Sequence, residues 1–117
     1  MKFALFLSAI LTYSFLNSQI LINEYSASNI DGINDAFGDK EDWIELYNTT
    51  AANVDLTGWY LSDRSGNPLK WTFPTSNVNA NDHKLIFCTG RDIDQGGELH
   101  TNFKLSQTEG DWIILSN

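Results

Sequence analysis

Short stretches in which apolar and polar residues alternate recur along the chain, separated by turn-forming residues. The clearest is residues 42–48, where Ile44 and Leu46 alternate with aromatic and polar side chains. Successive side chains point to opposite faces of a strand, so this pattern predicts a strand with one apolar face. Residues 56–63 repeat the pattern after a short polar loop, with Gly58 where the chain bends into the strand. These two runs predict the centre of a β-sheet protein.

Apolar runs elsewhere in the chain extend this prediction. Further strands or strand-like pieces are expected at residues 20–25, 54–56, 69–73, 84–89, 103–105 and 112–115. Asn, Asp, Gly and Pro between them favour turns, and no helical repeat follows residue 19, so we predict an all-β fold. The predicted core consists of Ile22, Ile44, Leu46, Leu56, Trp59, Leu61, Trp71, Phe73, Ile86, Phe103, Leu105 and Ile113.

Several motifs in these strands resemble the lamin tail domain family, in particular its secreted bacterial type. The motifs are DWIELYN, VDLTGWYLSD, KWTFP, KLIFCTGRD and LHTNFKLS. The resemblance runs from about Ile20 to Asn117 and implies an immunoglobulin-like β-sandwich of two sheets. The family pattern also implies a turn and a closing strand after Asn117. Either the module is one strand short or the sequence is a fragment of a longer protein, and we favour the fragment.

The N-terminus has the features of a secretory signal peptide. Lys2 supplies a positive charge, residues 3–16 are almost wholly apolar, and Ser18 is a small residue before Gln19. The apolar run is shorter than the roughly 20 residues of a membrane span. We therefore expect residues 1–18 to be cleaved, residues 19–117 to form the domain, and the product to be secreted or displayed at the cell surface without stable membrane insertion. An uncleaved anchor helix is the alternative.

The net charge of the chain limits the classes of molecule that it is expected to bind. Fifteen acidic residues face seven basic ones, a net charge of −8, which becomes −9 when Lys2 leaves with the signal peptide. Such a surface repels phosphate backbones, so we expect no nucleic-acid partner. The only cysteine, Cys88, lies in an apolar run and is expected to be a small buried residue, with an intermolecular thiol as the alternative.

Residues that could support catalysis are scarce. Only His83 and His100 could act as bases near neutral pH, and neither lies in a recognised metalloprotease or nucleophile motif. We expect both histidines in loops or at the surface. Glu45 lies among aromatic residues, and we expect it to complete a hydrogen-bond network on its strand rather than to act as an acid. The chain is therefore predicted not to be an enzyme.

Two groups of residues remain as binding candidates. Asp31, Asp35, Asp39 and Asp42 offer oxygen ligands of the kind that calcium prefers, although solvated loop charge explains them equally simply. No other cofactor is implied. Trp43 and Tyr47 share one face of their strand and could stack on sugars if that face were open, whereas in a sandwich they could equally fill or cover the core.

These observations predict a non-catalytic module for adhesion, protein–protein interaction or positioning of a neighbouring domain at the cell surface. Its working parts would be the loops at residues 26–41 and 91–98, carried on a rigid frame. One alternative is a carbohydrate-binding module with a glycan partner. Another is the non-catalytic front of a secreted enzyme, such as a spore-coat-type kinase or a nuclease.

Overall fold

The computed structural model describes residues 19–107 and 112–117, so the predicted signal peptide lies outside the described residues. This part of the chain contains strands and no helix, which confirms the all-β prediction. It therefore also holds no helix long and apolar enough to cross a membrane. The strands are β1 (Ile20–Ser26), β2 (Asp42–Asn48), β3 (Val54–Asp55), β4 (Tyr60–Ser62), β5 (Trp71–Thr72), β6 (Asn77–Val78), β7 (His83–Cys88), β8 (Ile93–Gln95), β9 (Glu98–His100) and β10 (Ile114–Ser116).

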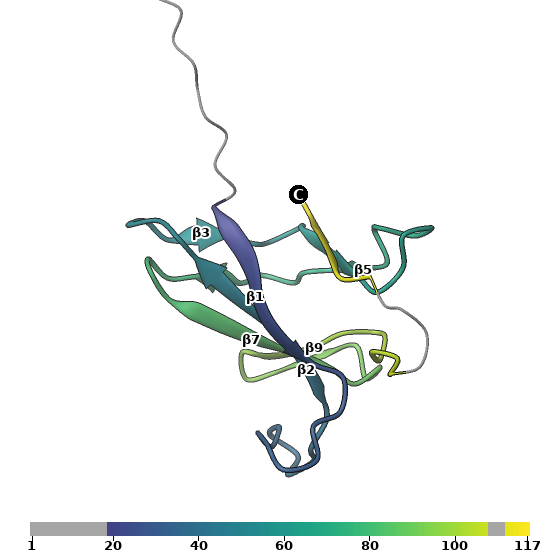
Figure 1. Cartoon of the computed structure of the whole chain (residues 1–117). Coiled ribbons are helices and arrows are strands. Elements are labelled where there is room, and N and C mark those ends of the chain that lie inside the picture. The colour runs from purple at the N-terminus through teal and green to yellow at the C-terminus, as the bar shows by residue number, and fades with distance from the viewer. Residues whose placement is uncertain (1–18, 108–111) are drawn as a thin grey trace, which may run out of the picture.

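The strands form two layers. One layer is a five-stranded sheet in the order β1-β2-β7-β9-β8, antiparallel except where β7 and β9 run parallel. The other layer combines a three-stranded sheet, β10-β4-β5, with the two-stranded pair β3-β6. Figure 1 shows β3 and β5 above the larger sheet, with the connection between β1 and β2 hanging below it. This arrangement is the predicted immunoglobulin-like sandwich.

The core lies between the layers, as alternation along the strands requires. On the larger sheet, Ile44 of β2 pairs with Ile86 of β7, which pairs with Leu99 of β9, and all three are almost fully buried. The opposite layer contributes Leu61 and Trp71 from β4 and β5. The remaining buried members are Ile20, Leu46, Val54, Leu56, Phe73, Val78, Cys88, Phe103 and Leu105. Most of the predicted core is thus confirmed.

Three predicted core residues are less buried than expected. Ile22 of β1 is paired with Leu46 and shares its face, yet 36% of Ile22 is exposed. The reason is that β1 is the last strand of its sheet, and the space over it is a groove of about 910 Å³ rather than packed side chains. Trp59 and Ile113 line the same groove and are only partly buried against the core.

Two strand predictions were also misplaced. Residues 69–73 were expected to form a strand, but Leu69 lies in the turn before β5 and is 54% exposed. Phe103 and Leu105 are buried as predicted, but the strand in this region is β9, which ends at His100. Both side chains are buried although their backbone does not pair with another strand. Alternation of apolar residues indicates burial but does not show whether the backbone forms a strand.

Candidate functional site

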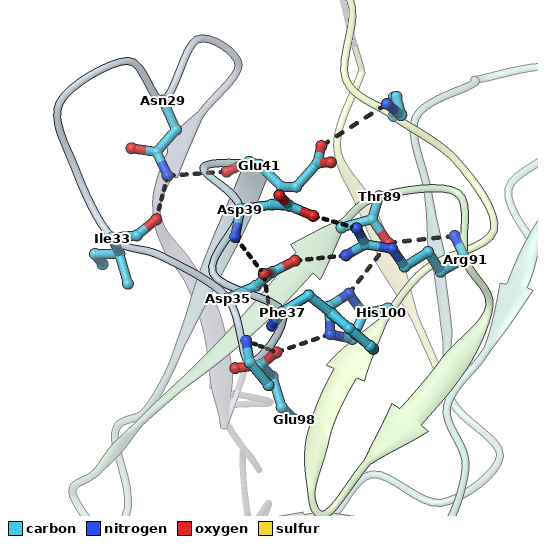
Figure 2. A network of polar contacts seen from close by, with 12 residues as sticks. Asn29, Ile33, Asp35, Phe37, Asp39, Glu41, Thr89, Arg91, Glu98 and His100 are labelled. Atoms are coloured by element: carbon cyan, nitrogen blue, oxygen red, sulfur yellow. Dashed lines mark hydrogen bonds and ion pairs between the residues drawn. The ribbon is translucent and has the colours of Figure 1, made fainter.

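The site is built from two connections that are far apart in sequence and that meet at one end of the larger sheet. The first is the long loop, residues 27–41, which joins β1 to its antiparallel partner β2. The second is residues 91–98, which lead into β8 and through its tight turn to β9. Figure 2 shows side chains from both connections converging. Both segments were predicted as working loops, but their contact was not.

Within the long loop, the chain wraps around the carboxylate of Asp35. Oδ1 of Asp35 accepts hydrogen bonds from the backbone N–H groups of Phe37 and Asp39, each at 2.9 Å. Two backbone bonds close the same turn, from Asp35 N–H to the Asp39 carbonyl at 2.8 Å and from Gly38 N–H to the Asp35 carbonyl at 3.0 Å. Gly38 has φ +82°, a conformation that glycine adopts without strain. We call residues 35–39 the head of the loop.

Arg91 joins this head to the other connection. Its Nη1 donates to Oδ2 of Asp35 at 2.6 Å, and its Nη2 donates to Oδ2 of Asp39 at 2.5 Å. The planar guanidinium presents donors in a fixed fork, so one arginine can hold two carboxylates. The Asp35 side chain has no exposed surface, whereas that of Asp39 is 53% exposed. Asp35 is therefore the buried anchor of the contact.

The protonation equilibria of Asp35 and Arg91 reflect this pairing. Burial by itself would raise the pKa of Asp35, but the backbone N–H of Asp39, the Arg91 side chain and the N–H of Phe37 together hold that pKa below its usual value. Hydrogen bonds to Asp39 and then Asp35 raise the pKa of Arg91 above its usual value. Both groups thus stay charged near neutral pH, as their contact requires.

An aromatic stack lies beneath the head, on the outer face of the sheet. Phe87 of β7 is 2% exposed although it points away from the core, and its ring stacks on His100 with centroids 5.6 Å apart. Phe37 of the head meets His100 edge-on at 5.6 Å, and the Arg91 guanidinium lies 4.4 Å from the Phe37 ring centroid. Aromatic rings attract one another in stacked and edge-on arrangements, and a cation is attracted to the face of a ring. The head therefore covers a small apolar cluster outside the main core.

His100 also links the head to the sheet by hydrogen bonds. Its Nε2 lies 2.8 Å from Oε1 of Glu98, and that same oxygen accepts the backbone N–H of Ala36 at 2.8 Å. Its Nδ1 lies 3.1 Å from Oγ1 of Thr89. In the neutral ring, Nε2–H donates to the carboxylate and Nδ1 accepts the hydroxyl proton. We call Asp35, Asp39, Arg91, Glu98 and His100 the latch. The prediction that His100 lies in a loop or at the surface was wrong, because it is the last residue of β9 and has no exposed surface.

The order of hydroxyl, imidazole and carboxylate in Thr89, His100 and Glu98 resembles that of a hydrolase triad. However, Thr89 is 5% exposed and His100 is fully buried, and Oγ1 of Thr89 also accepts the backbone N–H of Arg91 at 3.2 Å. A nucleophile must reach the substrate carbonyl, and Thr89 is almost fully buried in this structure. The arrangement therefore serves to hold the loop.

The neck of the long loop, residues 29–33 together with residues 40 and 41, is held by a separate set of hydrogen bonds, which we call the brace. Nδ2 of Asn29 donates to the carbonyl of Ile33 at 2.6 Å and to that of Glu41 at 3.0 Å, which ties the two sides of the loop together. Nζ of Lys40 donates to the carbonyl of Ile30 at 2.8 Å. None of these bonds involves the latch. The loop thus has two separately fastened parts, a braced neck and a latched head.

The four aspartates proposed as calcium ligands are used differently in the structure. Asp35 and Asp39 come together on Arg91, while Asp42 lies at the start of β2, where its Oδ2 accepts the N–H of Leu105 at 3.2 Å. Asp31 is exposed in the loop. No group of three or more His, Cys, Asp and Glu residues in the described ranges is placed to hold a metal ion. A calcium ion at Asp35 would have to displace the donors present, and calcium binding stays a prediction.

The proposed glycan-binding residues lie on the outer face of β2 and are half-buried. Tyr47 stacks on His83, which is exposed as predicted, with ring centroids 4.5 Å apart. Trp43 is paired with Phe87 across the strands. Between them, Glu45 accepts a hydrogen bond from Nδ2 of Asn23 at 2.8 Å, the network role predicted for it. Glycan binding by Trp43 and Tyr47 stays a prediction.

Cys88 belongs to the core cluster, as predicted for a small buried residue. It has no exposed surface, and burial raises the pKa of its thiol to about 12. The thiolate is the reactive form, so this thiol is unreactive in the folded domain. Cys88 therefore contributes packing rather than chemistry.

The residues that sequence reasoning missed are Phe37, Arg91, Glu98 and His100. Arg91 carried the best available signal, because it is the single basic residue of the acid-rich segment 91–98. An arginine in such surroundings favours a carboxylate partner. No comparable signal marks His100, since its burial depends on a loop that arrives from about sixty positions earlier in the chain.

The comparisons with known proteins agree with this architecture. The family model of the Lamin Tail Domain matches residues 15–117, which is most of the chain. No curated protein matches the chain, and neither does any solved structure. The family is one of non-catalytic, immunoglobulin-like domains. The match covers the strands, the long loop and the latch, and the chain belongs to the lamin tail domain family.

Proposed function

We propose that this domain is an exported, non-catalytic module that binds another protein at the cell surface through the end of the sandwich that carries the latch. The binding surface consists of residues 27–41 and 91–98, which we call the latched surface. Export would be directed by the predicted signal peptide. The observation that carries the proposal is the contact of Arg91 with Asp35 and Asp39, which fixes two distant loops into one surface.

Order in these loops supports a binding role. A loop that is already fixed loses less conformational entropy when it binds, so the binding energy is not spent on ordering it. The long loop is held at the neck by Asn29 and at the head by Arg91 and Glu98. Loops fixed on a rigid β-frame are common recognition elements. A loop that only joins two strands would not need so many hydrogen bonds and ion pairs to hold it in place.

The side chains that the latched surface presents also support the proposal. Ile30, Ile33 and Phe37 are 72%, 47% and 48% exposed, which is unusual for three large apolar residues of one loop in a soluble domain. Ile93 of the neighbouring hairpin is 37% exposed. Around them, the two segments hold seven acidic residues and two basic ones, a net of −5 out of −8 for the whole chain. Apolar anchors with a charged rim are typical of protein interfaces.

The test is adsorption of the full chain, labelled with a fluorophore, to intact cells of the organism that produces it. Wild-type protein is expected to bind, and the double variant Ile30→Ser/Ile33→Ser is expected to lose about tenfold or more in affinity, because buried apolar anchors carry much of the energy of an interface. Leu69→Ser is the control, since the exposed fraction of Leu69, 54%, lies between those of Ile30 and Ile33 and Leu69 lies outside both segments. Equal binding by all three proteins, or none by the wild type, would contradict the proposal.

A further inference from the structure

The head of the long loop is a self-contained unit. Its backbone bonds between Asp35 and Asp39, and the two N–H groups that point at Oδ1 of Asp35, all lie within residues 35–39. These bonds persist whether or not the head touches the sheet. The head can therefore move without unfolding, and the contacts that hold it in place can be considered separately.

Among the described residues, the side-chain hydrogen bonds, ion pairs and ring contacts between the head and the rest of the domain converge on three residues. Arg91 holds Asp35 and Asp39, Glu98 accepts the N–H of Ala36, and His100 packs against Phe37. The three lie close together, around β9 and the turn that precedes β8, as Figure 2 shows. The brace at Asn29 is separate and ties the neck to itself. Removing the contacts of Arg91 would thus leave the neck intact.

Charge contributes to this attachment together with apolar burial. Phe37 is the only large apolar side chain of the head, and it is still 48% exposed in the closed position. Beneath it, His100 and Phe87 are 0% and 2% exposed. Opening would uncover this ring pair and would bury nothing in exchange, so burial of the rings and the charge-assisted bonds both favour the closed state. Arg91 makes two of them and also lies over the Phe37 ring.

We propose that residues 35–39 form a strap that opens from the sheet as a single unit, and that Arg91 sets the population of its closed form. This proposal rests on the proposed function, because the closed strap would be the form that presents the latched surface to a partner. Opening uncovers the outer face at Phe87 and His100 and releases Asp35 and Asp39. The strap thus gives the domain a way to regulate its own binding surface, since a partner that favours one form shifts the population towards it.

Hydrogen–deuterium exchange of single amides in the full chain tests the strap. The reporters for the head are the N–H groups of Ala36, Phe37 and Asp39. The reporters for the frame are the N–H groups of Asn48 and Phe73, which bond to Asp82 and Trp59. In Arg91→Met we expect the N–H of Ala36, which bonds to Glu98 across the contact, to exchange about tenfold faster or more, the loss of one charge-assisted hydrogen bond being enough for that factor. The N–H groups of Phe37 and Asp39 should change less, because their bonds to Asp35 lie within the head. The frame amides should not change.

Arg64→Met serves as the matched control, because Arg64 is exposed and lies outside the latched surface. Slow exchange of the Ala36 N–H in Arg91→Met, or a rise at the N–H groups of Phe37 and Asp39 as large as the rise at Ala36, would overturn the strap. If Arg91→Met does not fold, Asp39→Asn replaces it, because this side chain is 53% exposed and its loss removes only one of the two ion pairs. Asp39→Asn should also accelerate exchange of the Ala36 N–H, by less.

The outcome for the strap is distinct from the outcome for binding, because exchange is measured without a partner. Faster exchange at the head with unchanged cell adsorption would support the strap and contradict the role of its closed form in binding. Faster exchange together with weaker adsorption would support both. Equal acceleration of head and frame amides would mean global destabilisation and would contradict a local strap.

Discussion

Ile86 and Phe87 are neighbours in β7 and both are buried, but different parts of the molecule bury them. Ile86 points into the space between the two layers, where strands from both sheets surround it. Phe87 points the other way and is covered by His100 and, beyond it, by the head of the long loop. The domain therefore has a main core between its sheets and a smaller cluster beneath a loop.

The two regions are stabilised by different forces. The main core is held by burial of apolar surface, which is roughly proportional to area and does not depend on direction. The cluster beneath the loop is closed by the latch, whose hydrogen bonds and ion pairs require fixed geometry. Disturbing the core should therefore unfold the whole domain, whereas disturbing the latch should release mainly the loop.

The largest expected effect comes from the main core. Phe73→Ala should lower the free energy of unfolding by about 3–5 kcal/mol, because Phe73 is 2% exposed and its removal leaves a cavity. The matched change in the head of the loop, Phe37→Ala, should cost about 1 kcal/mol, since that ring is half exposed and loses its edge-on contact with His100 and its contact with the Arg91 guanidinium. Chemical denaturation followed by tryptophan fluorescence measures both. Equal costs would contradict the distinction between the regions.

A change at the centre of the latch should have an intermediate effect. Asp35→Asn keeps the shape of the side chain but turns an N–H group, or a weaker acceptor, towards Arg91. We expect a loss of about 1.5–3 kcal/mol at pH 7, the range for hydrogen bonds to charged groups. Thermal or urea unfolding of the two proteins gives the difference. Asp31→Asn, in the same loop but exposed, is the control and should have little effect.

The pH dependence of that difference identifies its cause. The pKa of Asp35 is lowered in the folded domain from the usual 3.8, so its contribution to stability is fully present above pH 3.8. As the pH falls below 3.8 and through the folded pKa, the carboxyl takes up a proton and the contribution disappears. The difference in the free energy of unfolding between wild type and Asp35→Asn should therefore be constant from pH 5 to 7 and should decrease only below about pH 3.8. A difference that does not depend on pH would contradict the ionic role.

The smallest expected effect is at the neck of the loop. A Cβ atom at Gly32 would collide with Oδ1 of Asn29, whose Nδ2 braces the loop through Ile33 and Glu41. Gly32→Ala should therefore weaken the brace and cost about 1 kcal/mol or less, the net value of a neutral hydrogen bond. Gly66→Ala, where a Cβ meets nothing within 4 Å, is the control. Exchange of the loop amides is the measurement, and unchanged exchange in Gly32→Ala would show that Asn29 adjusts freely.

Much of the fold could be predicted because the strands repeat a simple pattern. The alternation in residues 42–48 correctly placed Ile44 and Leu46 in the core, and the same reasoning worked for Leu61, Trp71 and Ile86. It failed at Ile22, which has the correct orientation but lies over the groove at the edge of the sandwich. It failed at Leu69 for a related reason, since that residue lies in a turn and not in a strand. Alternation gives the direction of a side chain and not the presence of a neighbour above it.

The site could be predicted only in part. Residues 26–41 and 91–98 were recognisable as loops that could bind a partner, from their glycines, asparagines and acidic residues. The bridge between them was not recognisable, because Arg91 is separated from Asp35 by 56 positions and from Asp39 by 52. Without the fold, no pattern shows which of the fifteen acidic residues in the chain an arginine will meet.

The sequence by itself determined the all-β class, the family and most of the core, because side-chain alternation and turn residues act locally along the chain. Only the tertiary structure decided that His100 is buried, that Asp35 and Asp39 share one arginine, and that Phe87 is covered by a loop. Each of these depends on which distant segments the folded backbone brings within hydrogen-bonding distance. That choice is made by the packing of whole sheets and loops, which no short stretch of the chain contains.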